Sequence, residues 1–384
     1  MTVLSERLAA PRRERAVKNP IPWYTPRFWH GMRLWTWLST VVNSGFAVSF
    51  TRMHTALSIT FFSALNSLMA FGDRLVYGRR ISQVEVKEPP IFILGHWRSG
   101  TTFLHELMIR DPEHTFPTTY QCYVPHHFVL SEWWITPWTE MLLPNRRPMD
   151  NMAAGWQRPQ EDEFALGNLG VPTPYLSMMF PKRGPVHTEY LDLRDLTAAE
   201  RGRWKQELGE FFRRLTFCDP RRIVVKSPPH TARVRTLLEM YPDAKFVHLV
   251  RDPYALFVST VNLWKSLNEV QRMQGLGEQE WVEEYVLRTL EKMYTAYEED
   301  RQLLRDDQLV ELRYEDLVDN PLESVRDIYA QLELGDFSRA APVIEEYLAD
   351  VKNYRRNRYE ISTEQRATVS QRWAGYFERY GYEA

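Results

Sequence analysis

The stretch at 89–111, PPIFILGHWRSGTTFLHELMIRD, constrains the fold more than any other part of the chain. Its first seven residues are an apolar run, which predicts a buried strand. A G-x-x-x-x-G loop from Gly95 to Gly100 follows, and the residues after it predict a helix that ends before Pro112. A strand, a glycine turn and a helix in this order direct backbone N–H groups and a helix N-terminus at one place. Such a place favours a phosphate or sulfate.

Three later segments repeat this alternation. The segments RRIVVKSP at 221–228, DAKFVHLVRDP at 243–253 and QLVELRYEDL at 308–317 predict further strands with polar residues at their C-terminal ends. Helical stretches separate these strands, so the predicted fold is α/β, with a P-loop-like parallel sheet flanked by helices. We expect a helical, aromatic-rich N-terminal extension over residues 1–88. A main domain over residues 89–384 then ends in a helical segment.

The bulk composition narrows the function classes. The 384 residues carry a net charge of −2, whereas a dedicated nucleic-acid binder has a basic excess, so we expect no nucleic-acid partner. The two cysteines, Cys122 and Cys218, lie far apart and form neither a disulfide framework nor a C-x-x-C metal site. The first twenty residues are charged and have no apolar core of a secretory signal. These features predict a cytoplasmic protein in a reducing compartment.

The glycine loop lacks the lysine of a Walker A loop. Thr101 follows the second glycine, and the cation of the loop is Arg98. A γ-phosphate with Mg²⁺ therefore fits poorly, because a Walker A loop uses that lysine to reach the β- and γ-phosphates. A single 5′-phosphate with a charged group beyond it fits better. The glycine spacing alone is also consistent with a turn that binds nothing.

The fuller string GHWRSGTTFL resembles the 5′-phosphosulfate loop of sulfotransferases that use 3′-phosphoadenosine 5′-phosphosulfate (PAPS). The resemblance is to the bacterial and Golgi type, which has arginine before Ser-Gly-Thr-Thr. A second signature of that family, an arginine that ends a strand and a serine eight residues later, matches VHLVRDPYALFVST. The segments KSPPHTARVRTLLEMYPDAKFVHLVRDP and RYEDL are also similar, and the resemblance extends over residues 89–380.

The resemblance implies an enzyme that moves a sulfuryl group from PAPS to a hydroxyl or amine. The acceptor would be a lipid, a glycan or another small molecule. Adenosine 3′,5′-bisphosphate would be the product, and no metal would be needed. It also implies the donor-binding residues, which are Arg98, Ser99, Gly100, Thr101, Thr102 and Phe103 at the 5′ end, Arg251, Ser259 and Tyr314 toward the 3′ end, and a late basic segment with Arg355, Arg356 and Arg358 as a lid. A solvated basic turn remains the alternative for this last segment.

Two cations are candidates for stabilising charge during transfer. Arg98 lies in the loop, where charge develops on the bridging oxygen as the sulfuryl group leaves. Lys226 lies at the C-terminal end of the second predicted strand. A solvated loop lysine is the alternative for Lys226.

The general base is less clear from the sequence. Related enzymes often carry a glutamate about twenty residues after the loop, and this chain has Gln121 there, which accepts no proton. The segment PQEDEFAL offers Glu161 and Glu163, which we favour, although two such acids also simply complement a helix N-terminus. His105, in the helix after the loop, is a further candidate or a structural histidine. The pair at 126–127, His-His, is the remaining option.

The N-terminal extension has a composition typical of a membrane boundary. Tryptophan and arginine alternate in WYTPRFWHGMRLWTWL, and such side chains favour the membrane–water interface but also anchor cores. Residues 53–72 have the length of a membrane span, but their polar residues indicate a buried or interfacial helix instead. We therefore expect peripheral membrane contact through residues 1–88, with a lipid as one candidate acceptor.

Two alternatives remain open. A P-loop kinase for a small molecule would need a Walker lysine and an acidic strand end, for which Asp252 is a poor substitute. A non-catalytic, membrane-associated protein would keep the nucleotide site and transfer nothing, because function depends on the site and not on the fold.

Overall fold

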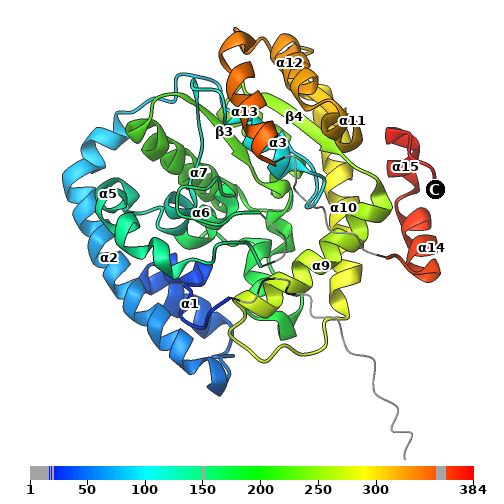
Figure 1. Cartoon of the computed structure of the whole chain (residues 1–384). Coiled ribbons are helices and arrows are strands. Elements are labelled where there is room, and N and C mark those ends of the chain that lie inside the picture. The colour runs from blue at the N-terminus through cyan, green and yellow to red at the C-terminus, as the bar shows by residue number, and fades with distance from the viewer. Residues whose placement is uncertain (1–16, 18, 20, 149–151, 352–359) are drawn as a thin grey trace, which may run out of the picture.

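The computed structural model describes residues 17, 19, 21–148, 152–351 and 360–384. Its centre is a parallel sheet in the order β2-β3-β1-β4-β5 (Figure 1). The strands are β1 (Ile91–Leu94), β2 (His114–Thr115), β3 (Arg222–Lys226), β4 (Lys245–Val250) and β5 (Leu309–Arg313). The predicted α/β fold class is confirmed, and the four predicted strands are β1, β3, β4 and β5.

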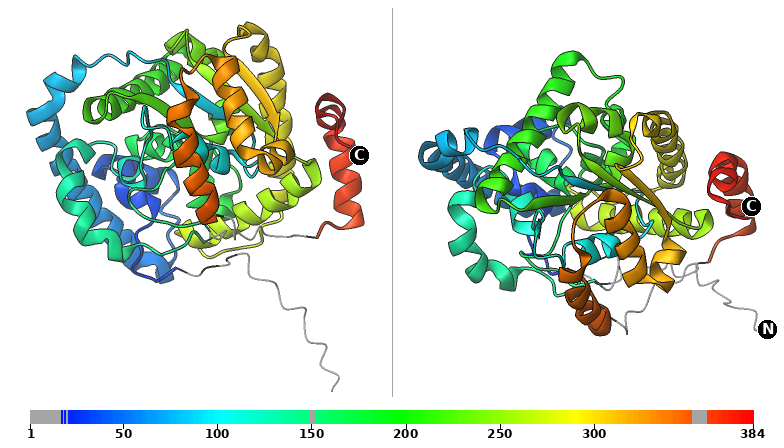
Figure 2. Two further views of the ribbon diagram at one scale, coloured as in Figure 1. Left: turned by 45° about the horizontal axis from the view of Figure 1, so that its top comes forward. Right: turned by 90° about the horizontal axis from the view of Figure 1, so that it is seen from above.

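Helices lie on both faces of the sheet (Figure 2). Successive side chains of β1 point to opposite faces of the sheet. Ile91 and Ile93 face one hydrophobic core, and Phe92 and Leu94 face the other. The helices of the described ranges are α1 (Leu34–Asn43), α2 (Met53–Ser82), α3 (Thr101–Met108), α4 (Thr119–Tyr123), α5 (Phe128–Thr139), α6 (Asp162–Leu169), α7 (Ala198–Cys218), α8 (Val234–Met240), α9 (Pro253–Gln271), α10 (Trp281–Asp300), α11 (Tyr314–Asp319), α12 (Pro321–Leu332), α13 (Ala341–Val351), α14 (Thr363–Arg372) and α15 (Ala374–Tyr380).

Three of these helices determine where the site lies. Helix α3 begins directly after the glycine loop, and α9 begins directly after the Arg-Asp-Pro that follows β4. Helix α6 lies with its acidic N-terminus against the end of β3, where Ser227 accepts a hydrogen bond from the backbone N–H of Glu163 at 3.2 Å. The C-terminal helices α14 and α15 lie beside α9 and α10 at the edge of the molecule (Figure 1).

The N-terminal extension packs into the main core. Trp29, Met32 and Trp37 are almost fully buried and belong to the same cluster as the sheet residues. Helix α2 packs against α1, α5 and α7 (Figure 1). Residues 21–88 therefore pack with the main domain as one folded body. The domain boundary at residue 89 stays a prediction from the sequence.

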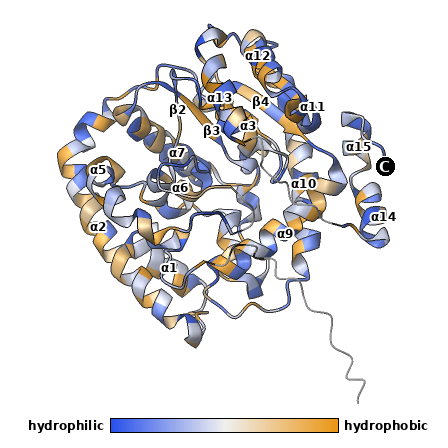
Figure 3. Ribbon diagram, viewed as in Figure 1, coloured by the Kyte–Doolittle hydropathy of each residue, from blue (hydrophilic) through white to orange (hydrophobic). Residues whose placement is uncertain are grey.

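Helix α2 includes the sequence stretch that has the length of a membrane span. By length and apolarity the segment Phe50–Ser82 passes as a membrane-spanning candidate, and 28% of its most apolar window is buried. Long core helices of soluble proteins have the same length and apolarity. The position of α2 on the outside of the body is the more informative observation (Figure 3).

Candidate active site

The carboxyl ends of the four longer strands meet at one edge of the sheet, and each leads into a predicted site residue. The glycine loop follows β1, Lys226 ends β3, Arg251 follows β4 and Tyr314 follows β5. Strand β1 pairs with β3 on one side and with β4 on the other, so the chain reverses its direction of winding here. Ligands of doubly wound sheets bind in the crevice at this reversal point.

The loop has the backbone conformation of an anion cradle. Gly95 and Gly100 have φ values of 141° and 102°, and Arg98 between them has a φ of 70°. A left-handed arginine is strained, and such strain is often found at binding sites. Gly100 also lies against the Tyr314 ring, so that a Cβ at this position would overlap the ring. Glycine is therefore required there by both conformation and space.

The two halves of the predicted donor site lie together. Arg98 Nε donates to Ser259 Oγ at 3.0 Å, and Arg251 Nη1 donates to the backbone carbonyl oxygen of Arg98 at 2.9 Å. The Arg251 guanidinium also lies over the Tyr314 ring, 4.5 Å from its centroid. Two guanidinium groups and a hydroxyl thus converge beside the N-termini of α3 and α9, which is a strongly anion-attracting arrangement.

The loop residues fit a phosphosulfate group. The Ser99 hydroxyl is buried and has no hydrogen-bond partner within the described ranges, so it is available to donate to an anion. Gly100 is the N-cap of α3 and provides no side-chain cap, which leaves the first amides of the helix for a ligand. Thr101 and Thr102 are the first two residues of α3, and Phe103 packs against the core that contains Ile91 and Ile93.

The C-terminal helices support the second arginine. The Tyr376 hydroxyl of α15 accepts a hydrogen bond from the Arg251 backbone N–H and donates one to the Arg251 carbonyl oxygen, both at 3.1 Å. Sequence reasoning missed this contact, because 125 residues separate the two and no local pattern connects them. The proposed lid residues Arg355, Arg356 and Arg358 lie outside the described residues.

Each acid of the 161–163 triplet has its own partner near the end of β3. Glu161 accepts from the Lys226 ammonium, and Asp162 accepts from the Ser227 hydroxyl and from His230. Glu163 forms a buried ion pair with Arg233 at 2.6 Å and accepts from Thr173 at 2.5 Å. The triplet therefore connects α6 to the sheet.

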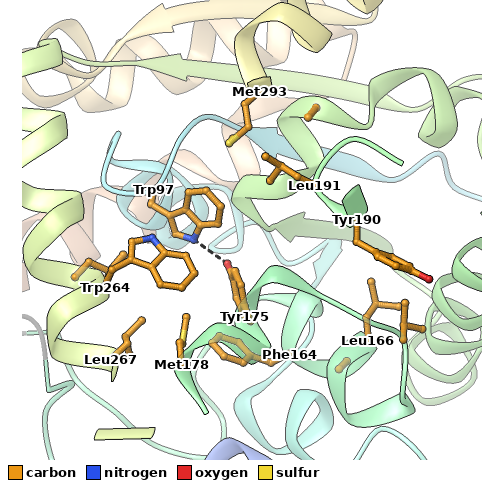
Figure 4. Close-up of a cluster of buried hydrophobic side chains, with 14 of the residues drawn as sticks. Trp97, Phe164, Leu166, Tyr175, Met178, Tyr190, Leu191, Trp264, Leu267 and Met293 are labelled. Atoms are coloured by element: carbon orange, nitrogen blue, oxygen red, sulfur yellow. Dashed lines mark hydrogen bonds between the residues drawn. The ribbon is translucent and has the colours of Figure 1, made fainter. Parts of the chain in front are cut away.

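Glu161 is the member of the triplet that also lines a pocket. The Tyr175 hydroxyl donates to Glu161. The same hydroxyl accepts from Trp97 Nε1 at 2.9 Å (Figure 4). The pocket that contains these three side chains also reaches Thr102 and the buried carboxylate of Glu106. Its apolar wall includes Phe28, Phe164, Met178, Trp264 and Leu267. The pocket thus joins the loop at Thr102 to a mostly apolar chamber with Glu161 in its wall.

Burial and neighbouring groups shift the pKa values of the side chains in this network. Burial lowers the pKa of Lys226, and the neighbouring Glu161 carboxylate partly opposes that change. Burial alone would raise the pKa of Asp162, but His230 and Ser227 lower it below its usual range. Burial and the adjacent Glu161 raise the pKa of Tyr175 well above its usual value, so this hydroxyl stays protonated and keeps donating. The network therefore holds one carboxylate between an ammonium and a phenol.

The other predicted bases lie elsewhere. Glu163 is held by Arg233, and neither Glu163 nor His105 is among the described residues that line the pocket. His105 Nε2 lies 3.1 Å from the Val224 carbonyl oxygen, and burial lowers the pKa of His105 to about 3. Gln121 caps α4 and donates to Glu132 at 3.0 Å, so a glutamate there would meet a like charge. These contacts give each residue a structural role.

Other histidines are also buried, and burial lowers their pKa values as it does for His105. Burial lowers the pKa of His96 to about 3, and that of His30 and His127 to about 4. Burial also lowers the pKa of His126 well below its usual range. His127 contacts Ser131 and Asn66, at 2.8 and 3.3 Å, and so joins α5 to α2 instead of facing the pocket.

Glu106 is a pocket carboxylate that sequence reasoning did not select. It lies one helical turn after Thr102 on the same side of α3, and Arg110 Nη2 donates to it at 2.6 Å. The i, i+4 spacing from Thr102 indicates Glu106 only when it is known which face of α3 lines the pocket. Glu106 is thus a second carboxylate in the pocket, one helical turn from the donor loop.

Comparisons with known proteins decide the family. The model described as "Sulfotransferase family" matches residues 89–338. The chain belongs to the sulfotransferase family. A protein of Mycobacterium bovis, named omega-hydroxy-beta-dihydromenaquinone-9 sulfotransferase Stf3, is 41% identical over 363 residues, which cover 94% of this chain and 92% of that protein. A protein of the same name from Mycobacterium tuberculosis matches to the same extent. The predicted sulfotransferase activity is thereby confirmed over the kinase alternative.

Solved structures agree on the fold. Sulfotransferase STF9 from Mycobacterium avium superposes with a TM-score of 0.67 at 17% identity, over 88% of each chain. Sulfotransferase STF1 from Mycobacterium tuberculosis superposes with a TM-score of 0.61 at 19% identity, over 88% of this chain and 90% of that one.

Proposed function

We propose that this sulfotransferase moves the sulfuryl group of PAPS to a hydroxyl of a long apolar lipid, of the quinone class for which the 41% identical relative is named. The observation that carries the proposal is the junction at Thr102, where the donor loop meets a pocket lined mostly by aromatic and aliphatic side chains. The hydroxyl groups of a polar glycan would lack hydrogen-bond partners against such a wall, whereas an isoprenoid or quinone ring buries apolar surface against it.

The donor supplies an activated sulfuryl group whose sulfur–oxygen bond to the 5′-phosphate breaks as a bond to the acceptor oxygen forms. The loop amides, Ser99 and the α3 N-terminus hold the 5′ end, and Arg251 with Ser259 holds the 3′-phosphate. Arg98 lies between the two groups and stabilises the negative charge that returns to the phosphate oxygen. No metal is assigned a role.

Lys226 and Glu161 act on the acceptor side. Glu161 takes the proton that the acceptor hydroxyl loses, and Tyr175 fixes the orientation of its carboxylate. The Glu161 carboxylate opposes the lowering of the Lys226 pKa by burial, and the Lys226 ammonium adds positive charge near the transferred group. Of the bases considered from the sequence, Glu161 has the support of lining the pocket.

We also propose that the chain meets its lipid at the cytoplasmic surface of a membrane, through the N-terminal segment 1–88. Two observations support this placement. Trp23 and Trp35 are highly exposed, and both cysteines are free thiols, which persist in a reducing compartment. A truncation of the segment would not test this, because Trp29 and Trp37 belong to the core.

The test of the proposed function is transfer of labelled sulfate from PAPS to a menaquinol derivative with a terminal hydroxyl, in detergent micelles and with a chelator present. The matched control is the same lipid without that hydroxyl. We expect a sulfated product by mass spectrometry from the first lipid only. Transfer to neither lipid, combined with transfer to a water-soluble sugar, would contradict the lipid assignment. Phosphate transfer from Mg·ATP would contradict the enzyme class.

A further inference from the structure

Helix α2 buries polar as well as apolar residues and exposes a row of large apolar side chains. The buried side of the helix includes Ser63, Asn66 and Asp73. The opposite side carries Leu57, Phe61, Leu68 and Leu75, which are 65–70% exposed. Positions separated by four or seven residues share one face of a helix, so these four form a single outward stripe. A water-exposed helix has the reverse pattern.

The inward polar residues attach the helix along its length. Asn66 donates to the carbonyl oxygens of His30 and Met32, at 2.7 and 3.1 Å, and Asp73 forms a buried ion pair with Arg214 at 2.6 Å. A membrane span would have to leave the body and break these bonds in hydrocarbon, where unpaired polar groups are costly. The contacts therefore hold α2 flat on the body.

Helix α5 extends this apolar surface. It packs alongside α2, and the Leu130 backbone N–H donates to Asp73 at 3.2 Å. Trp133 and Trp138 of α5 are 76% and 80% exposed. In Figure 3 the apolar colouring runs over both helices on the same edge of the molecule. We call the α2 stripe together with these two tryptophans the apolar face.

The charges on the α2 part of the apolar face suit an anionic surface, although Glu132 and Glu140 lie beside the tryptophans of α5. The segment Phe50–Ser82 contains a single acidic residue, Asp73, which is buried in its ion pair. Arg74 and Arg79 near the end of α2 are exposed. Basic side chains beside an apolar stripe with tryptophans are the composition of a helix that lies in the interface of a bilayer with anionic lipids.

Two segments that line the acceptor pocket lie next in the sequence to exposed aromatic residues. Leu143 and Pro144, which line the pocket, come directly after η3 (Glu140–Leu142), the short helix that follows α5. On the other side, Ile21 and Phe28 line the pocket and flank the exposed Trp23. The pocket lining thus includes two segments that are adjacent in the chain to exposed aromatic side chains.

We infer that the apolar face lies in the headgroup region of an anionic bilayer, with α2 parallel to the membrane plane, and that the lipid acceptor enters the pocket from the bilayer. This inference rests on the proposed lipid acceptor. It goes further because it assigns the docking surface to α2 and α5 and excludes a spanning helix.

The first test measures binding without turnover. Full-length chain is floated with phosphatidylcholine vesicles that contain or lack phosphatidylglycerol. A stripe variant (Leu57→Ser, Phe61→Ser, Leu68→Ser and Leu75→Ser) is compared with a control variant that changes exposed apolar residues elsewhere, Leu303→Ser with Val343→Ser. The parent and the control should float, more strongly with phosphatidylglycerol. The partition coefficient of the stripe variant should fall by about 100-fold or more, because four large apolar side chains leave the acyl boundary.

A second measurement separates this inference from the proposed function. Sulfate transfer to the lipid acceptor is measured in micelles and in vesicles, and the stripe variant should keep its micelle activity while its vesicle activity falls. Activity of the parent in micelles with no vesicle binding would overturn the docking surface alone. So would equal flotation of stripe and control variants. A lipid-free parent that sediments as a dimer, with a monomeric stripe variant, would assign the face to a second copy and also overturn the inference.

Discussion

Replacement of Glu161 by glutamine tests the acceptor side of the site most sharply. The amide keeps the shape of the carboxylate and still accepts from Tyr175, but it removes the charge beside the buried Lys226 ammonium. If Glu161 is the base, kcat should fall by about 10²–10⁴-fold, the usual contribution of a general base. Loss of one partner of a buried pair costs about 3–5 kcal/mol, so the folded fraction is measured before kcat is compared.

The chain offers a matched control two residues away. Glu163→Gln also removes a buried carboxylate from an ion pair, with Arg233, but at a position outside the pocket lining among the described residues. Both variants should lose comparable stability in urea unfolding. Only Glu161→Gln should lose kcat, measured with saturating PAPS and acceptor. Equal kcat values for the two variants would refute the base assignment.

The pH profile distinguishes a base from a residue that merely holds Lys226. The Glu161 carboxylate raises the pKa of Lys226 against the effect of burial, so its loss lowers that pKa further. If Glu161 only kept Lys226 protonated, activity of Glu161→Gln would return as the pH falls and the lysine regains its proton. A missing base is not restored by acid, so we expect no recovery. Recovery at low pH would move the catalytic role from Glu161 to Lys226.

The remaining predictions concern the donor site and stability. Arg251→Ala should weaken binding of adenosine 3′,5′-bisphosphate by about 10–100-fold in calorimetry, whereas Arg98→Ala should also lower kcat by about 10²–10³-fold; parent-like binding by both would contradict the site. Gly100→Ala should abolish nucleotide binding in a thermal-shift assay, because its Cβ would overlap a ring, whereas Gly381→Ala, also at a positive φ but with open space around it, should bind normally; binding by both would contradict the cradle. Acid should destabilise the fold, because the four histidines with pKa values near 3 and 4 bind protons near pH 6.5 only when unfolded. Their contribution is complete above pH 6.5 and falls below it, by about 2 kcal/mol each at pH 5, and equal urea midpoints at pH 7 and pH 5 would contradict this.

The strands and the glycine loop could be predicted because neighbouring residues in the sequence define them. The apolar runs of β1, β3, β4 and β5 have a periodicity and flanking residues that define strands, and the glycine loop fixes the start of α3. Strand β2 has two residues, His114 and Thr115, and gives no such signal. The family resemblance placed Arg251 and Ser259 in one site, and the structure brings both within contact of Arg98.

Long-range pairing explains what the sequence could not provide. The partner of Glu161 lies 65 residues later at Lys226, so neither residue type nor spacing separates it from Glu163. The sequence of helix α2 does not show which of its sides faces outward, and the inward contacts of Asn66 and Asp73 identify the buried side. Tyr376 supports Arg251 from the far end of the chain.

The most direct test of the central claim is calorimetric titration of adenosine 3′,5′-bisphosphate into the full chain with a chelator present. We expect one site per chain without metal. In the double variant Arg98→Ala with Arg251→Ala, the affinity should be at least about 100-fold lower, because two charge-assisted contacts are lost. A chain that binds no nucleotide, or a double variant that binds like the parent, would contradict the donor site from which the rest of the mechanism follows.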